Sequence, residues 1–311
     1  PYFGGRALVD NTEDEYAIST FIKKTLLSVN KLENVTLKKR TMASGVYDHG
    51  YVLGYERISD HEPTSGSLRH RLWKIRAKKI ILASGAIERP LVFPGNDIPG
   101  VMLASAVRDY VKLYAVSPGD RTVIVTNNDD AYRTAIDLNS AGLSVPAIID
   151  VRDHCDSSLT DAVRKLGIQV KNGKGIAKVS GKKQVNSVAI CSQKGSGSVD
   201  EIIECDVVAM SGGWSPVVHL WSHCGGKLIW NEERAMFLPN MDFPPRNDDG
   251  DGLVCPTGAA VGCSSTSGCI ASSISTTVKV VEDLGLKVKK LASPKIVEFE
   301  YNKIEPIWLM P

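Results

Sequence analysis

The most regular hydrophobic pattern of the chain lies between residues 122 and 170. Short runs of β-branched and aliphatic residues predict buried strands, and the stretches between them repeat apolar residues at helical spacing. The order is strand, helix, strand, helix, strand, at 122–125, 130–141, 145–149, 157–166 and 168–170. This βαβαβ order is typical of a parallel sheet with helical crossovers. We therefore predict an α/β fold.

Weaker patterns surround this unit on both sides. Apolar residues at helical spacing predict a helix over 13–29, and alternation in period two predicts a hairpin over 44–56. Polar residues in 61–71 indicate a loop. After the βαβαβ unit, short alternating runs in 171–200 predict a small antiparallel meander, and the apolar run 205–210 predicts a returning buried strand.

A strand that ends in a glycine turn is the most informative local feature. The four apolar residues 80–83 run directly into Ser84 and Gly85. Such a run predicts a buried parallel strand with a tight turn at its carboxyl end. Since glycine has no Cβ, a ligand such as a dinucleotide can lie against the bare backbone at this turn.

A second glycine turn follows another short strand pattern near the end of the chain. Residues 252–256 lead into Thr257, Gly258 and Ala259, and a helix rich in small residues is predicted over 264–284. One interpretation places this turn beside a ligand. The other is that Gly258 only lets the helix pack close to the strand.

The first strand-to-helix turn of the βαβαβ unit departs from a phosphate-binding loop. A dinucleotide fingerprint would have the pattern G-x-G-x-x-G/A, but residues 126–131 read Thr-Asn-Asn-Asp-Asp-Ala. Asp129 and Asp130 place negative charge where a pyrophosphate needs free N–H groups and the positive end of a helix. The sequence therefore disfavours NAD(P) binding at this turn.

Composition and charge exclude several classes of protein. With 311 residues and a formal net charge of +2, the chain can form two domains and has no basic excess that would predict nucleic-acid binding. No apolar run reaches membrane-spanning length, and no signal-peptide pattern is present, so a cytoplasmic protein is expected. Because the sequence begins with Pro1 and ends without a polar tail, we expect a longer gene product.

Metal and disulfide chemistry have weak support. The seven cysteines include no C-x-x-C pair, which argues against a disulfide framework and a zinc ribbon. His219 and His223 are four residues apart beside Cys224, but no acidic partner supports a metal site there. Residues 247–252 resemble the start of a calcium loop, yet Gly258 stands where the bidentate glutamate is needed.

The two glycine turns resemble those of the glutathione-reductase-like flavoprotein superfamily. In that superfamily the first turn is usually Ala-Thr-Gly, and here it is Ala83-Ser84-Gly85. The continuation through residue 100 is similar to the amine-oxidising branch, which includes the alpha subunits of heterotetrameric sarcosine oxidase. Further matches in the same order are residues 45–53, 127–132 and 208–216.

This resemblance implies a two-dinucleotide-binding-domain, Rossmann-type fold with an incomplete first domain. The first domain would comprise 1–116 and 205–311, with its N-terminal βαβ unit missing, and 117–204 would form the inserted second domain. Both glycine turns would belong to one cofactor pocket, contacted by Ala83, Ser84, Gly85, Thr257, Gly258 and Ala259. Flavin-binding relatives carry Gly-Asp at the second turn, so Gly258-Ala259 favours NAD over tightly held FAD. The turn at 212–216 would begin a helix, with Ser215 as its N-cap.

The resemblance also implies an activity and partners. Sarcosine oxidase demethylates sarcosine to glycine, reduces oxygen to hydrogen peroxide and forms 5,10-methylenetetrahydrofolate. The alpha subunit would hold NAD and one wall of an FMN site at the interface with the beta subunit, which would carry FAD. Tetrahydrofolate would bind a C-terminal domain beyond residue 311. The partners would be the beta subunit with further, smaller subunits, and the amine-binding and hydride-transfer residues would lie on beta.

Two alternatives stay open from the sequence. The chain could belong to a related opine oxidase, cyanide synthase or amino-acid dehydrogenase, which uses a different donor or acceptor. It could also be a non-catalytic scaffold, in which the altered loops only hold partner subunits together.

Overall fold

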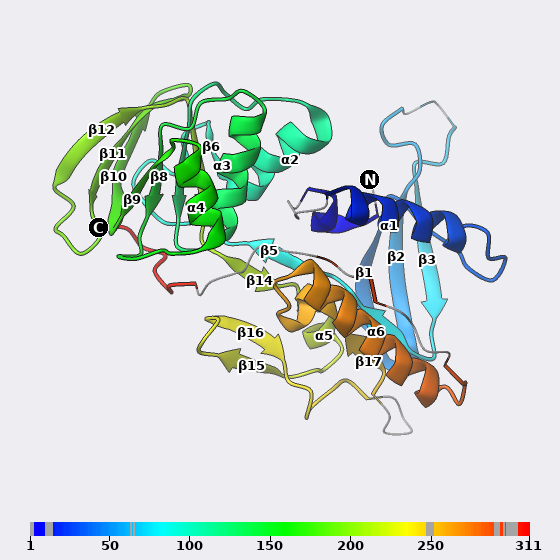
Figure 1. Cartoon of the computed structure of the whole chain (residues 1–311). Helices are drawn as coiled ribbons and strands as arrows, with labels where there is room; N and C mark the ends of the chain where they lie inside the picture. Colours follow the sequence, from blue (N-terminus) through cyan, green and yellow to red (C-terminus); the bar gives the residue numbers. More distant parts are fainter. Residues whose placement is uncertain are drawn as a thin grey trace.

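The computed structural model describes residues 3–9, 15–62, 64, 66–246, 252–288, 293–294, 296 and 304–311. Figure 1 shows a layered α/β unit built around strands β6 to β13, beside a second unit that contains the N-terminal helix and the long helix α6. The two antiparallel strands β5 and β14 lie between these units.

The predicted βαβαβ unit is confirmed. Its elements are β7 (Thr122–Thr126), α3 (Asp130–Ser140), β8 (Ala147–Asp150), α4 (Ser158–Lys165) and β9 (Gln169–Asn172). The strands pair in parallel in the order β7, β8, β9. Ser157 caps α4, because its hydroxyl accepts a hydrogen bond from the Thr160 N–H.

The parallel sheet extends beyond the predicted span 117–204. It has five strands in the order β6-β13-β7-β8-β9, and it takes in β6 (Val101–Leu103) and β13 (Val207–Ser211). Helix α2 (Ala104–Tyr114) connects β6 to β7. The division of the chain into domains stays a prediction, but this sheet runs from Val101 to Ser211.

Alternation along the sheet strands divides the core into two layers. Val123 and Val125 pack with the meander β10 (Lys174–Gly181), β11 (Val185–Ser192) and β12 (Val199–Glu204). Ile124, between them, packs with helices α2, α3 and α4 on the opposite face. Since neighbouring side chains of a strand point to opposite faces, one apolar run supplies both cores.

The second unit begins with α1 (Glu15–Val29), which confirms the predicted helix from Glu15 onward; residues 13 and 14 lie outside the described part. The predicted hairpin is also confirmed as β1 (Thr41–Tyr47), the turn η2 (Asp48–Gly50) and β2 (Tyr51–Arg57). The sequence pattern missed β3 (His70–Arg76), which pairs with β2. Most of its residues are exposed beside a partly buried Trp73, so burial alternation is too weak to mark it as a strand.

Two short strands bring the glycine turns together. Strand β4 (Ile80–Leu82) pairs in parallel with β17 (Val254–Pro256), which confirms that the two turns belong to one place in the fold. The first run is less buried than expected, because Ile81 is 42% exposed. Helix α6 (Thr266–Asp283) follows β17, after the turn η3 (Gly258–Val261).

The prediction that Ser215 caps a helix is wrong. Ser215 lies in β14 (Trp214–Pro216), which pairs with β5 (Ala86–Glu88), and the short helix α5 (His219–His223) begins after Val218. The long-range pairing with β5 outweighs the local capping preference. The hairpin β15 (Leu228–Asn231) and β16 (Met236–Pro239) follows.

The last described residues, 304–311, return to the five-stranded sheet and are called here the C-terminal strap. Leu309 makes a parallel bridge with Val92, and Met310 is buried in the core on the meander side of the sheet. In Figure 1 the strap is the red segment near β9 and β10. Among the described residues, no helix is long and apolar enough to cross a membrane.

Candidate functional site

A cavity of about 640 Å³ opens at the carboxyl ends of β4 and β17. All six residues predicted to contact a cofactor line it: Ala83, Ser84, Gly85, Thr257, Gly258 and Ala259. The structure thus brings together two turns that lie far apart in the sequence. Whether these residues contact a cofactor stays a prediction. The volume is typical of a small-molecule pocket.

The first turn presents open backbone to this cavity. Gly85 has φ +77°, and a Cβ built on it would meet no atom within 4 Å. Ser84 braces the turn, because its hydroxyl donates a hydrogen bond of 2.6 Å to the Val217 carbonyl. The Val217 N–H in turn donates to the Gly85 carbonyl at 2.9 Å. A ligand can therefore approach the backbone at Gly85 closely.

The second turn is used differently. The Gly258 N–H donates to Ser272 Oγ at 3.1 Å, so helix α6 already occupies this donor. A Cβ on Gly258, where φ is +64°, would lie 3.7 Å from the Cβ and Sγ of Cys269. A Cβ at this distance would make only ordinary van der Waals contact, so the positive φ, and not the spacing between helix and strand, is what favours glycine here. The turn still forms a wall of the cavity through Thr257 and Ala259.

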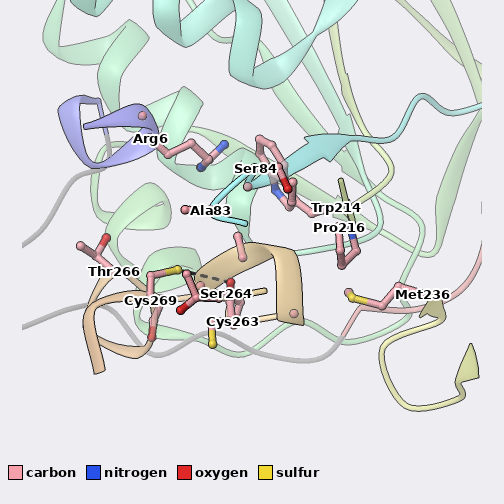
Figure 2. A pocket seen from close by; sticks show the side chains of 18 of the residues that line it. Arg6, Ala83, Ser84, Trp214, Pro216, Met236, Cys263, Ser264, Thr266 and Cys269 are labelled. Carbon is pink, nitrogen blue, oxygen red and sulfur yellow. Dashed lines mark hydrogen bonds between the residues drawn. The ribbon is translucent and has the colours of Figure 1, made fainter. Parts of the chain in front are cut away.

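Several residues of the cavity were missed by the sequence analysis. Gly4, Gly5 and Arg6 approach from the N-terminal turn η1 (Gly5–Leu8), and Trp214 and Arg234 come from the second half of the chain. Figure 2 shows Arg6, Ser84 and Trp214 on one side of the cavity and Cys263 to Cys269 on the other. The sequence did contain one signal for this part of the cavity, the pair Gly4-Gly5, since two adjacent glycines often mark a backbone conformation that other residues avoid. Both glycines have positive φ in the structure, at +122° and +53°.

The Asn-Asp loop after β7 is buried and internally neutralised. Asp129 pairs with Arg152 at 2.8 Å, and Asp130 pairs with Arg6 at 2.8 Å. Burial alone would raise the pKa of Asp130, but the charges of Arg6, Arg108 and Arg133 outweigh it and lower this pKa to about 2. The two carboxylates therefore serve as ion-pair partners within the chain, and the expectation that this turn does not bind NAD(P) stays a prediction.

The C-terminal strap covers the carboxyl edge of the five-stranded sheet at this loop. The Glu305 N–H donates to the Asn127 carbonyl at 3.1 Å, and Asn127 Nδ2 donates to the Ile307 carbonyl at 3.0 Å. Trp308 Nε1 donates to the Gly212 carbonyl at 2.7 Å, at the end of the neighbouring strand. Ligands of open α/β sheets bind at such edges. In this protein the C-terminal strap lies at that edge.

Glu88 is a further buried carboxyl close to this loop. Its Oε2 accepts a hydrogen bond of 2.9 Å from the Ser105 N–H in the first turn of α2. Burial, followed by the negative charge of Asp130, raises the pKa of Glu88 above its ordinary value. The carboxyl caps the helix and stays protonated to a higher pH than an exposed glutamate.

The residues considered for metal binding make contacts within the fold. His223 Nδ1 lies 2.7 Å from the Val46 carbonyl, and the Cys224 Sγ donates to the Leu220 carbonyl. Within the described ranges, no group of three or more potential ligands could hold a metal ion. The calcium-like residues 247–251 lie outside the described part. All seven cysteines are free thiols.

The cavity fits part of a dinucleotide on structural grounds. Bare backbone with open space at Gly5 and Gly85 allows close approach of a flat or extended ligand. Arg6 and Arg234 supply positive charge at the wall, and the serine and threonine side chains of 264–266 supply hydroxyl groups. Residue 259, on the second turn, is alanine, so the turn offers no carboxylate of its own at this position.

The chain is similar in sequence to subunits of amine-oxidising enzymes. The chain is 35% identical to the alpha subunit of the sarcosine oxidase of Rhizobium meliloti (strain 1021), over 99% of this chain and 30% of that protein. It is 32% identical to the alpha subunit of the sarcosine oxidase of Corynebacterium sp. (strain P-1), over 94% of this chain and 30% of that protein. The chain thus spans about a third of the length of these relatives. An opine oxidase subunit of Agrobacterium tumefaciens (strain Ach5) is 25% identical, over 74% of this chain and 48% of that protein.

Solved structures show the same fold. L-proline dehydrogenase from P. horikoshii superimposes with a TM-score of 0.64 at 20% identity, covering 93% of this chain and 50% of that protein. Thioredoxin reductase from T. acidophilum superimposes with a TM-score of 0.60 at 16% identity, covering 90% and 86%. Residues 18–234 match the family described as pyridine nucleotide-disulphide oxidoreductase. The predicted two-dinucleotide-binding fold is confirmed, and the chain belongs to the pyridine nucleotide-disulphide oxidoreductase family.

Proposed function

We propose that this chain is the dinucleotide-binding part of the alpha subunit of a sarcosine oxidase, and that its cavity holds NAD. The observation that carries the proposal is the meeting of two glycine turns at one cavity, in a chain that matches sarcosine oxidase alpha subunits over nearly its whole length. The protein would be a redox enzyme that acts on an amine as one member of a hetero-oligomer.

The residues of the cavity have binding roles in this proposal. Gly85 and Gly5 let the ligand lie against the backbone, while Ser84, through Val217, keeps the first turn in place. Thr257 and Ala259 form the adjoining part of the wall. Bound NAD would supply a nicotinamide ring able to exchange hydride. The absence of a carboxylate at position 259 favours NAD over FAD in this cavity.

The flavins and the folate are assigned to other places. FMN would lie at the interface with the beta subunit, FAD within the beta subunit, and tetrahydrofolate in a further domain of the alpha polypeptide. Oxidation of sarcosine would then take place on the beta subunit, and smaller subunits would complete the assembly. A cytoplasmic location belongs to the same proposal.

A second candidate is an opine oxidase or a related amine dehydrogenase. The match to the opine oxidase subunit of Agrobacterium tumefaciens favours it, because the chain covers 48% of that protein, a larger share than of the sarcosine oxidase subunits. Its 25% identity is lower than the 35% to a sarcosine oxidase subunit. We therefore place it second.

The test uses the full-length protein purified with its partner subunits. Acid release followed by chromatography would identify the nucleotides, and turnover would be followed as glycine, hydrogen peroxide and 5,10-methylenetetrahydrofolate with sarcosine as donor. We expect turnover with sarcosine, and NAD bound to the alpha subunit. An alpha subunit that neither retains nor takes up NAD would reject the cavity assignment, and turnover with opines but not sarcosine would select the second candidate.

A further inference from the structure

Asp130 is surrounded by three arginines that come from different parts of the chain. Arg6 Nη2 lies 2.8 Å from Oδ1, Arg108 Nη2 lies 3.5 Å from Oδ2, and Arg133 Nε lies 3.6 Å from Oδ1. One carboxylate thus faces three guanidinium groups.

Arg6 differs from the other two arginines in its exposure. The Arg108 and Arg133 side chains are buried, with exposed fractions of 0% and 8%, whereas the Arg6 side chain is 31% exposed and lines the cavity. Of the three arginines, Arg6 is therefore the one that a ligand in the cavity can reach.

The guanidinium of Arg6 is held from two sides. Its Cζ lies 3.9 Å from the centroid of the Trp214 ring, and its Nη2 contacts both oxygens of Asp130, at 2.8 and 3.0 Å. Trp214 Nε1 also donates to Asp130 Oδ2 at 3.2 Å, so the ring and the carboxylate are themselves linked. A guanidinium fixed in this way loses little conformational entropy when it binds an anion.

We propose that Arg6 binds a phosphate of the dinucleotide in the cavity and that Asp130 is its positioning residue. This inference rests on the proposed function, in which the cavity holds NAD. The other charged residues at the wall are Arg234 and Glu233. In a nucleotide-binding βαβ unit, the loop after the first strand binds phosphate. Here Asp130 of that loop instead positions Arg6 at the wall of the cavity. The charged ligand group is identified by chemistry, because planar guanidinium groups match phosphate oxygens.

The main test compares phosphate-bearing and phosphate-free ligands in the full-length protein by calorimetry. Arg6→Gln should weaken the binding of NAD and of AMP by about tenfold to a hundredfold, the loss expected for a charge-assisted hydrogen bond. Binding of adenosine, which has no phosphate, should not change. Arg6→Lys should recover part of the affinity, since it restores the charge without the planar fork.

Neighbouring carboxylates provide a matched control for the positioning role. Asp129→Asn and Asp130→Asn each break a buried ion pair, so both should lower the melting temperature. Asp130 lines the cavity and Asp129 does not, so Asp130→Asn alone should weaken the binding of NAD and of AMP, because it frees the Arg6 guanidinium from its fixed position, and it should leave the binding of adenosine unchanged.

The possible failures are distinguishable. If the wild-type protein binds NAD and Arg6→Gln binds it equally well, this inference is rejected while the proposed function stands. Equal losses for NAD and adenosine would also reject it, because the residue would then act on the pocket as a whole. A wild-type protein that binds no NAD rejects the proposed function, and this inference with it.

Discussion

Gly85 and Gly258 look alike in sequence but differ in their surroundings. A side chain at Gly85 would enter open space, whereas one at Gly258 would contact Cys269 of α6. Both have positive φ, which disfavours every residue with a Cβ. Contact with a ligand is therefore best tested at Gly85, because packing effects are smallest there.

Gly85→Val should reduce NAD retention in the full-length alpha subunit. Valine at φ +77° costs about 1–2 kcal/mol in backbone strain, and its branched side chain would enter the cavity. We expect affinity to fall by about tenfold to a hundredfold, as measured by released NAD. FAD assigned to the beta subunit should stay bound.

Gly167→Val is the matched control for this substitution. Gly167 has φ +78° and open space around its Cβ position, yet it follows α4 and does not line the cavity. Both variants should lose similar stability. If Gly85→Val folds well and keeps its NAD, or loses no more NAD than Gly167→Val, the assignment of Gly85 to the cofactor site is wrong.

At the scale of elements, the strap covers the carboxyl ends of two strands of the five-stranded sheet. Its backbone forms hydrogen bonds with Asn127, and its Trp308 donates one to the Gly212 carbonyl. The strap thus covers the carboxyl ends of β7 and β13. Gly212 and Gly213 leave room for it, because a Cβ would lie 2.9 Å from Trp308 at the first position and 2.2 Å from Ile304 at the second.

Trp308→Ala should destabilise the sheet unit without creating a second NAD site. Loss of this partly buried ring and its hydrogen bond should lower the free energy of unfolding by roughly 2–4 kcal/mol, measured by denaturant titration. Trp230→Ala is the control, since Trp230 is 42% exposed on β15 and should cost far less. Calorimetry should still give one NAD per alpha chain. Binding of two NAD per alpha chain, or an unchanged free energy of unfolding, would contradict this prediction.

At the scale of the whole molecule, the two units share one candidate cavity. Arg6 belongs to the N-terminal turn, and Asp130 follows a strand of the five-stranded sheet, so their ion pair joins the two units beside the cavity. Both residues line the cavity, so its wall is built from both units.

Flavin content tests this view of the whole molecule. Expressed without its partners, the full-length alpha subunit should bind NAD and retain no stoichiometric flavin, because alanine at position 259 offers no carboxylate to hold a ribityl chain. The absorbance spectrum of the purified protein is the measurement. A yellow protein with one flavin per alpha chain would contradict the prediction.

Local periodicity was enough to predict the elements whose burial repeats along the chain. Strands β7 to β9, helices α3 and α4 and the β1–β2 hairpin all follow from it, since each strand or helix face must match the layer that it buries. The two glycine turns were also predictable, because glycine is the residue that most readily accepts the backbone conformation that they need.

Contacts between distant segments depend instead on the complete fold. Arg6 and Asp130 are separated by 124 positions. The contacts of the strap and the pairing of β14 with β5 also correspond to no local pattern in the sequence. Strands of three residues, such as β5 and β14, are too short to show an alternation of apolar and polar residues, and an ion pair between distant residues leaves no periodic pattern in the sequence. Local sequence records which face is buried, whereas the partner of a buried charge or a short strand is fixed only when the whole chain has folded.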